Sequence, residues 1–164
     1  MKTGRAYFLP TILTLAAVAQ IVLAFVLYNN EGSSIVRNAG WVLLWVSAVF
    51  GWLPIFTLKK WGKTEGRGYV HTTVVVDRGI YAVVRHPQYL AGMLMGAALP
   101  LIVQHWLVAL LGAVVIVVYY WDTFEEERSC IEKFGAAYEG YRKSVPRVNF
   151  VAGMMRLVRR GVKG

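Results

Sequence analysis

The residue types best suited to chemistry stand at the start of an apolar stretch, "YAVVRHPQYLAGMLMG", residues 81–96. Arg85, His86 and Pro87 directly precede the apolar residues, and ionisable groups at a membrane boundary are costly and often functional. Pro87 suits the first turn of a helix, because the N–H that proline lacks would be unpaired there. We therefore expect a helix to begin at Pro87 and to leave Arg85 and His86 in the headgroup layer of a membrane.

A second stretch, "EEERSCIEKFGAAYEGYRKSVPR", residues 125–147, is rich in charged residues and begins with three glutamates. Glu132 follows Arg128 by four residues, so these two side chains are predicted to pair along one helix. Glu126 and Glu127 have no basic residue three or four positions further on, so their partners must be water, another segment or a ligand. Spacing alone leaves a solvated helix end and a binding site equally open.

The composition indicates that both stretches belong to a membrane protein. The chain has 164 residues, which suits a single domain (1–164), and 57% of them are hydrophobic, too many for an ordinary soluble domain. The formal net charge of +9 is compatible with binding nucleic acid or an anionic membrane surface, and the apolar runs favour the membrane. We therefore expect no nucleic-acid partner. His71, His86 and His105 are not spaced as metal ligands, so we also expect no metal site.

Four apolar runs predict an all-α integral membrane protein with about four transmembrane helices. The first two runs can each cross a hydrocarbon core about 30 Å thick, because a helix rises about 1.5 Å per residue. The last two are shorter than the roughly 20 residues of a full span, so they either extend through their polar flanks or form a tilted helical hairpin. The predicted parts are spans at about 6–28, 39–58, 88–103 and 106–124, a cytoplasmic connector, 59–87, and a cytoplasmic C-terminal segment with amphipathic helices, 125–164.

The positions of the basic residues predict the orientation in the membrane. Lysine and arginine concentrate before the first span, between the second and third, and after the fourth, whereas Arg37 alone lies between the first two. Four spans bring all the basic segments to one side, which the positive-inside rule makes the cytoplasm. We therefore expect a multi-pass protein with both termini cytoplasmic. The tail "VAGMMRLVRRGVKG", 151–164, mixes apolar and basic residues and predicts an interfacial helix in contact with anionic lipid.

An antiparallel hairpin of the last two spans would bring the two chemical stretches together. His86 precedes the predicted turn at Gln104–His105 by 18 residues, and Glu125 follows that turn by 20 residues. Similar counts along two antiparallel helices give nearly equal depth, so the basic pair and the acids should meet at the cytoplasmic mouth of the hairpin. Gly96 and Gly112 should also match in height, where small residues let two helices approach closely.

The two stretches together resemble the signatures of one enzyme superfamily. "DRGIYAVVRHPQYLAGMLMG", 77–96, resembles the GxY…RHPxY signature of the isoprenylcysteine carboxyl methyltransferase and phospholipid methyltransferase superfamily. Residues 125–147 resemble its closing signature, a Glu pair followed by FG, by two tyrosines and by PR. The resemblance covers residues 75–149 and implies a membrane methyltransferase that uses S-adenosylmethionine without a Rossmann domain. The sequence agrees, since no GxGxxG follows a predicted strand.

The resemblance also implies roles for individual residues. A cationic pair, Arg85 and His86, suits the carboxylate of the cofactor, and Glu126 or Glu127 suits its ammonium group or ribose. A carboxylate acceptor needs no base, and Arg147 would hold it by a bidentate contact. A lipid amine needs a base, for which Glu126 or His86 is the candidate. The implied cofactor-binding residues are Arg85, His86, Tyr89, Tyr81, Glu126, Glu127 and Tyr141, and the implied catalytic residues are Arg147 and Glu126.

Two positions depart from the family pattern. Cys130 stands where a leucine is usual, and Phe150 stands where a proline often ends the second motif. Because both positions tolerate apolar residues, we expect these departures to affect packing rather than chemistry.

The resemblance leaves the methyl acceptor open. It implies an isoprenylated or other lipidic molecule, methylated on a carboxyl oxygen or, as in phospholipid methylation, on an amine nitrogen. Two other functions also remain open. One is a membrane reductase of the sterol-reductase type, which would bind a nicotinamide cofactor. The other is a non-enzymatic helical membrane protein that binds anionic lipid through its basic tail, and such a protein would bind neither cofactor.

Overall fold

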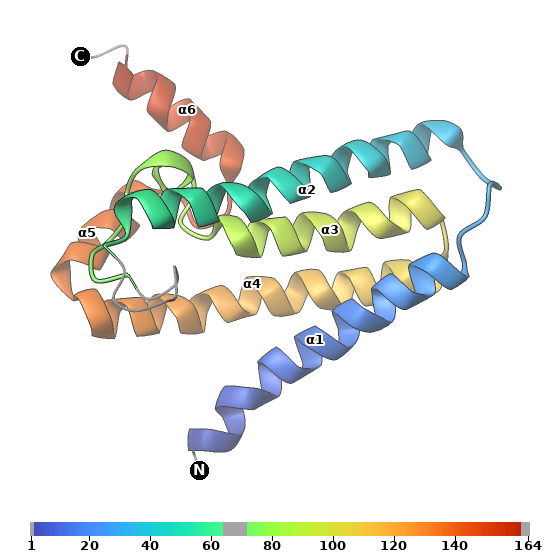
Figure 1. Ribbon diagram of the computed structural model, residues 1–164, viewed down its shortest axis with the longest axis horizontal. Coiled ribbons are helices and arrows are strands. Elements are labelled where there is room, and N and C mark those ends of the chain that lie inside the picture. The colour runs from blue at the N-terminus through green and yellow to red at the C-terminus, as the bar shows by residue number, and fades with distance from the viewer. Residues whose placement is uncertain (1, 64–71, 162–164) are drawn as a thin grey trace. The chain divides into compact units, whose positions relative to one another are not determined.

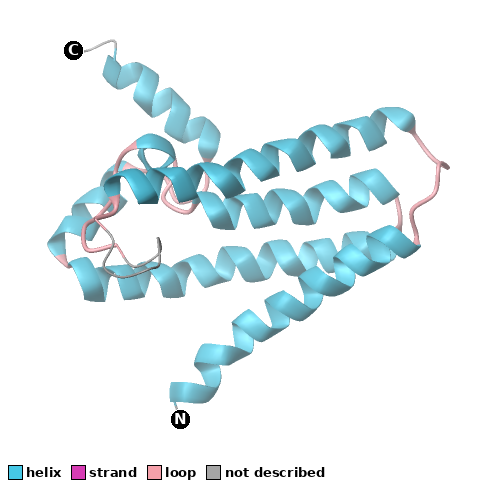
Figure 2. Cartoon of the chain, viewed as in Figure 1, coloured by secondary structure: helices cyan, strands magenta, loops and turns pink. Residues whose placement is uncertain are grey.

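The computed structural model describes residues 2–63 and 72–161, which form an all-helical chain (Figures 1 and 2). Within those two ranges there is no strand, so the predicted all-α class is confirmed. Part of the predicted connector, including His71, lies outside the described residues. The elements are α1 (Lys2–Val26), α2 (Ser34–Trp61), the 3-10 helix η1 (Gly79–Ala82), α3 (Pro87–Val103), α4 (Trp106–Phe134), α5 (Ala136–Ser144) and α6 (Phe150–Gly161).

Two of these helices, α2 with 28 residues and α4 with 29, are long and apolar enough to cross a membrane. The apolar part of α1, Thr11–Val26, and the whole of α3 are shorter apolar helices. All four predicted spans therefore coincide with helices. Helix α4 continues to Phe134, beyond the predicted end of its span at 124, because most of the added residues favour helix.

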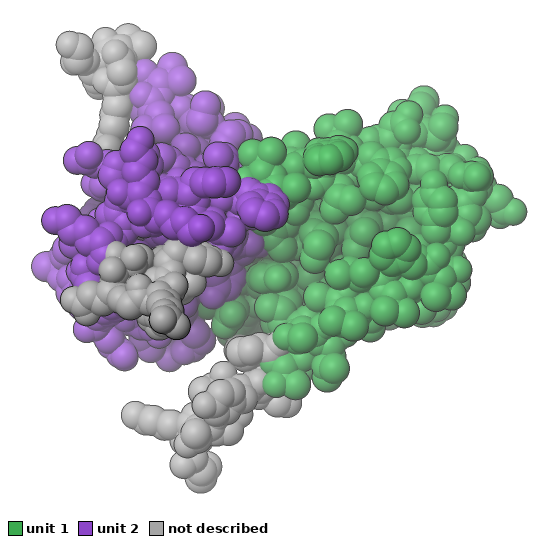
Figure 3. All heavy atoms as spheres, in the orientation of Figure 1, with its two compact units in different colours: residues 1–49, 90–122 green, residues 50–89, 123–164 purple. Residues whose placement is uncertain are grey.

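The chain divides into two compact units, which Figure 3 shows in different colours. Unit 1 contains residues 1–49 and 90–122, and unit 2 contains residues 50–89 and 123–164. Residues of α1, α3 and α4 supply one buried core of unit 1, against which Leu44 of α2 also packs. The fully or nearly buried members of that core are Ala24, Ile102, Val103 and Val108.

Gln20 lies within α1 and is completely buried in unit 1. Its Nε2 donates hydrogen bonds to the carbonyl oxygens of Gly96 in α3, at 2.9 Å, and of Val108 in α4, at 3.2 Å. A Cβ at Gly112 would overlap the carbonyl oxygen of Gly96, so α3 and α4 are in close contact there. The predicted match in height of Gly96 and Gly112 is therefore confirmed, and this contact requires a residue without a side chain at Gly112.

The predicted turn at Gln104–His105 is also confirmed, since α3 ends at Val103 and α4 begins at Trp106. Gln104 adopts a left-handed backbone conformation with φ 54°. Its side-chain amide pairs with the backbone of Ser33 in both directions. The Ser33 N–H donates to Gln104 Oε1 at 2.9 Å, and Gln104 Nε2 donates to the Ser33 carbonyl at 2.8 Å. This pairing fixes the turn to the residue before α2.

Unit 2 contains the residues that the sequence predicted to form a site. Gly135, with φ 55°, separates α4 from α5, a conformation that glycine adopts without strain. Helix α5 then presents Tyr138 and Tyr141 to a small core that includes Val145 and, from the segment before η1, Val75. The core of unit 2 is therefore partly aromatic, and the two tyrosines lie next to the residues described below.

Candidate active site

The two signature stretches are joined by their backbones within unit 2. The Arg85 N–H donates to the carbonyl oxygen of Pro146 at 3.0 Å, and the His86 N–H donates to that of Arg147 at 3.1 Å. Pro87 then begins α3, as its missing N–H predicts. The segment before α3 is thus held against the segment between α5 and α6, and this contact fixes the positions of both basic side chains.

Glu127 is the centre of a buried ion cluster and is only 2% exposed. Arg85 donates to Glu127 Oε1 from Nε at 3.0 Å and from Nη2 at 2.5 Å. Arg147 donates from Nη2 to Oε2 at 2.7 Å and from Nε to Oε1 at 3.1 Å. His86 Nε2 lies 3.3 Å from the same Oε1. Of the three kinds of partner that the sequence left open for Glu127, the structure provides another segment of the chain.

The surroundings of Glu127 act on its pKa in opposite directions. Burial is the largest single influence, and it raises the pKa. The hydrogen bonds from His86, Arg147 and Arg85, together with the charge of Arg85, outweigh burial and hold the pKa of Glu127 well below its usual range. The carboxylate is therefore ionised at neutral pH. Removing one partner of such a buried pair typically costs about 3–5 kcal/mol of stability, because the remaining charge is left without compensation.

The Arg85 side chain makes four hydrogen bonds within the protein, two of them to Glu127. The other two run from Nη1 to the carbonyl oxygens of Arg142, at 2.5 Å, and of Val145, at 2.6 Å. These carbonyls belong to the C-terminal end of α5, where a helix has unpaired acceptors and favours a positive charge. Because a guanidinium has five N–H groups, Arg85 uses most of its donors to cap α5 and to hold Glu127.

A cavity opens beside the cluster. Its volume is about 140 Å³, which is smaller than a typical small-molecule site, and its mouth is open, so a ligand would extend beyond it. All of its lining residues belong to unit 2. Six of the seven predicted cofactor-binding residues line it: Tyr81, Arg85, His86, Tyr89, Glu126 and Tyr141. Among the described residues, neither Glu127 nor Arg147 contributes to the lining.

The walls of the cavity are largely aromatic and apolar. The Tyr141 hydroxyl donates to the carbonyl oxygen of Tyr81 at 2.7 Å, and the rings of Tyr138 and Tyr141 meet edge-on with centroids 5.7 Å apart. The rings of His86 and Tyr89 meet in the same way at 5.5 Å. Burial raises the pKa of Tyr138 and of Tyr141, so both phenols stay protonated at neutral pH. Such walls suit a flat, partly apolar ligand group.

Glu126 differs from its neighbour Glu127 because it is exposed and lines the cavity. The Sγ of Cys130 lies 3.9 Å from Glu126 Oε1. Burial and the charge of Glu126 raise the pKa of the Cys130 thiol to about 11, so the thiol stays protonated at neutral pH. Of the predicted acidic pair, Glu126 is therefore the carboxylate that is accessible to a ligand in the cavity.

Arg147, the other predicted catalytic residue, is the most exposed cation of the cluster, with 21% of its side chain accessible against 8% for Arg85. Its Nε and Nη2 face Glu127, and its guanidinium carbon lies 3.7 Å from the centre of the Phe124 ring. The Nε–Nη2 edge of Arg147 therefore already holds Glu127.

The structure also shows contacts that the sequence did not predict. Carbonyl groups of the α5–α6 region hold Arg85 and His86, and no side-chain pattern reports backbone acceptors. The apolar wall of the cavity includes Leu58, Val74, Val75, Val76, Phe134 and Tyr138. Phe134 and Tyr138 match the second signature, although neither was among the implied site residues, whereas the run of valines gave no chemical signal.

One predicted ion pair is wrong. Arg128 pairs with Glu125, three residues before it, at 3.0 Å, rather than with Glu132. Both acids are within reach of Arg128 on one helix, so the spacing could not decide between them. Because both partners in the observed pair are more than half exposed, the pair contributes little to stability.

Comparison with known proteins gives one match. The model of the family described as phospholipid methyltransferase matches residues 35–137, which is more than half of the chain. The matched range includes Arg85, His86, Glu126 and Glu127 and ends before Arg147. No curated protein and no solved structure matches this chain.

Among the described residues, no group of three or more His, Cys, Asp or Glu side chains could hold a metal ion.

Proposed function

Because the chain belongs to the phospholipid methyltransferase family, we propose that it transfers a methyl group from S-adenosylmethionine to a lipidic acceptor in a membrane. Family membership indicates methyltransferase activity and a lipid substrate, and with the two long apolar helices it indicates a membrane protein. The observation that carries the finer proposal is the aromatic cavity with Glu126 at its edge, beside the buried Arg85–Glu127 pair.

The lining of the cavity fits most groups of S-adenosylmethionine. Its tyrosines and valines suit the adenine ring, and Glu126 suits the ammonium group of the methionine part. When bound, the cofactor supplies a methyl group on a positively charged sulfur, which a nucleophile can displace in line. The donors of Arg85 are mostly bound within the protein, so Arg85 has little capacity left to bind the carboxylate of the cofactor. We therefore propose that Arg85 and Glu127 hold the wall of the cavity in position. The wall itself is formed in part by Tyr81, His86, Tyr89 and Tyr141.

The chain's own contribution to the reaction is positioning and exclusion of water, which can supply much of the acceleration of a displacement. For a carboxyl acceptor, we propose that Arg147 orients the acceptor oxygen. For an amine acceptor, we propose that Glu126 accepts the proton, because it is exposed in the cavity whereas His86 already contacts Glu127. The acceptor that we propose is an isoprenylated or otherwise lipidic molecule, methylated on oxygen or on nitrogen.

We further propose that the whole chain, residues 1–164, is one multi-pass membrane domain in which α1 to α4 all cross the bilayer and both termini are cytoplasmic. The positive-inside rule supports this topology, since the basic residues concentrate in segments that four spans place on one side. The anionic lipids of that side would be natural partners of the basic tail.

Calorimetric titration of S-adenosylmethionine into the protein in lipid nanodiscs tests the proposal. We expect saturable binding, and we expect Glu126→Gln to weaken it about tenfold or more, as the loss of a charge-assisted hydrogen bond does. Glu132→Gln is the matched control, because Glu132 is also exposed on α4 but does not line the cavity. Folded wild-type protein that binds a nicotinamide cofactor instead would support the reductase alternative. Protein that binds neither would support the non-enzymatic one.

A further inference from the structure

Helix α6 belongs to unit 2 and packs against the rest of that unit through one narrow face. At its start, the ring of Phe150 meets that of Phe50 in α2 edge-on, with centroids 5.1 Å apart. Gly153 is buried so closely against the carbonyl of Val83 that a Cβ would overlap it. One turn further on, Arg156 donates a hydrogen bond to a backbone carbonyl of η1. The residues at intervals of three from Phe150 to Arg156 therefore fix the orientation of α6.

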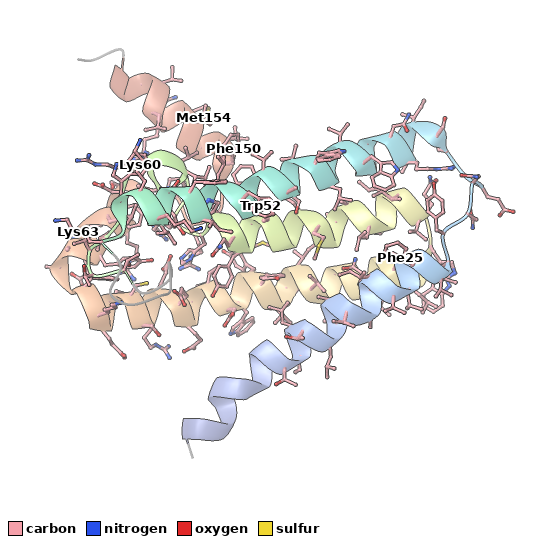
Figure 4. The ribbon with its side chains drawn as sticks, viewed as in Figure 1. Phe25, Trp52, Lys60, Lys63, Phe150 and Met154 are labelled. Atoms are coloured by element: carbon pink, nitrogen blue, oxygen red, sulfur yellow. The ribbon has the colours of Figure 1, made fainter. Side chains whose placement is uncertain are left out.

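The fixed orientation leaves a different face of α6 exposed, and that face is apolar. Val151 is 63% exposed and Val158 is 61% exposed, with Met154 and Met155 between them at about half exposure. Their spacing, i, i+3, i+4 and i+7, places the four side chains on one side of the helix. Figure 4 shows Phe150 and Met154 on α6, Lys60 in the last turn of α2, and Lys63 just after that helix. A contiguous apolar face of this kind marks a binding surface.

The charged residues of α6 and of the chain segments on either side of it are basic. Residues 140–164 contain seven basic residues and no acidic one, and Arg159 lies exposed on α6 directly beside Val158. Lys59 and Lys60, in the last turn of α2, are exposed in the same unit. A second copy of the chain would bring an equally positive surface to the contact, and nucleic acid would leave the apolar side chains in water. A membrane with anionic lipids has an apolar interior and negatively charged headgroups. It therefore complements both the apolar face and the positive charge of α6.

We propose that α6 lies in the interface of an anionic phospholipid membrane, with Val151, Met154, Met155 and Val158 in the acyl boundary and Arg159 among the headgroups. Methionine and valine side chains reach the boundary region, while arginine can extend to the phosphates. The proposal goes beyond methyl transfer. It can hold or fail whatever the cofactor is, because it concerns where α6 lies and not what the cavity binds.

Spin labelling of the full chain tests the proposal. In a Cys130→Ser background, Val158→Cys carries a nitroxide label, and the protein is placed in nanodiscs of phosphatidylcholine alone or mixed with phosphatidylglycerol. With the anionic lipid, we expect the label to become accessible to dissolved oxygen and shielded from a water-soluble nickel chelate. Glu132→Cys is the control, because Glu132 is exposed on a polar stretch of α4 and should stay accessible to nickel in every disc. The readout requires neither cofactor nor methyl transfer.

A charge variant completes the test. The double change Arg159→Glu and Arg160→Glu should weaken the shielding of the label at residue 158 from the nickel chelate about tenfold or more. The reason is that each basic residue near an anionic surface strengthens the attraction to it. A label that stays open to nickel in both kinds of disc would overturn the proposal. Shielding that is equal in both kinds of disc and survives high salt, or that rises with protein concentration in detergent, would overturn it too. The last result would identify a second copy of the chain as the occupant.

Discussion

Arg85 and Glu127 stand 42 residues apart in the sequence, and their side chains form a buried ion pair with 2.5 Å between Nη2 and Oε1. The pair connects the residues before α3 to α4, and through the remaining donors of Arg85 it also connects them to the end of α5. The cavity that we propose for the cofactor lies beside this connection and has Arg85 in its lining. The acid–base pair is thus a scaffold for the cavity wall.

Glu127→Gln should destabilise the protein by about 3–5 kcal/mol, because it leaves the buried Arg85 and the partly buried Arg147 without their shared carboxylate. Thermal unfolding in nanodiscs, followed by circular dichroism, measures the effect. Glu126→Gln, the adjacent change, should shift the midpoint little because Glu126 is exposed. Equal midpoints for Glu127→Gln and the wild type would contradict the scaffold role of Glu127.

The same pair predicts how stability depends on pH. The pKa of Glu127 is depressed in the folded protein from an ordinary value of 4.5. The ionised Glu127 therefore contributes fully to the free energy of unfolding above about pH 4.5. This contribution is lost as the pH falls below that value towards the folded-state pKa. Unfolding midpoints measured from neutral to acidic pH should fall more steeply below that point in the wild type than in Glu127→Gln. Parallel curves would show that another group controls acid unfolding.

Alkylation of Cys130 should report occupancy of the cavity, since Cys130 is the single cysteine of the chain and lines it. With a thiol pKa of about 11, reaction with N-ethylmaleimide should be slow at neutral pH and accelerate about tenfold per pH unit below that value. Adding S-adenosylmethionine should slow the reaction, and mass spectrometry of the intact protein measures the rate. If saturating cofactor leaves the rate unchanged, the cofactor binds elsewhere or not at all.

Gly112→Val should destabilise the protein by about 1–3 kcal/mol, because the new side chain would overlap the Gly96 carbonyl within unit 1. Gly140→Ala is the opposite control. Gly140 lies inside α5 with open space around its Cβ position, so alanine should stabilise the helix by about 0.5–1 kcal/mol. Unfolding midpoints of the two variants should therefore move in opposite directions. A neutral Gly112→Val would mean that α3 and α4 do not need this close contact.

The sequence by itself determined the features that depend on local or periodic patterns. The apolar runs fixed the positions of α1 to α4, Pro87 fixed the start of α3, and the polar pair Gln104–His105 fixed the turn of the hairpin. The order and spacing of the two signatures were enough to indicate the family that the match over residues 35–137 shows. Each of these features is specified by neighbouring residues or by counting along the chain, so no three-dimensional information was needed.

Only the tertiary structure decided which charged groups face each other. Glu126 and Glu127 are adjacent and chemically equivalent in the sequence, but about 100° apart around a helix. Packing against the segment before α3 turns Glu127 into the cluster and leaves Glu126 on the cavity. The same packing makes the backbone carbonyls of Pro146 and Arg147 acceptors for Arg85 and His86. Such partners depend on how separate segments meet, and a linear pattern of side chains does not contain that information.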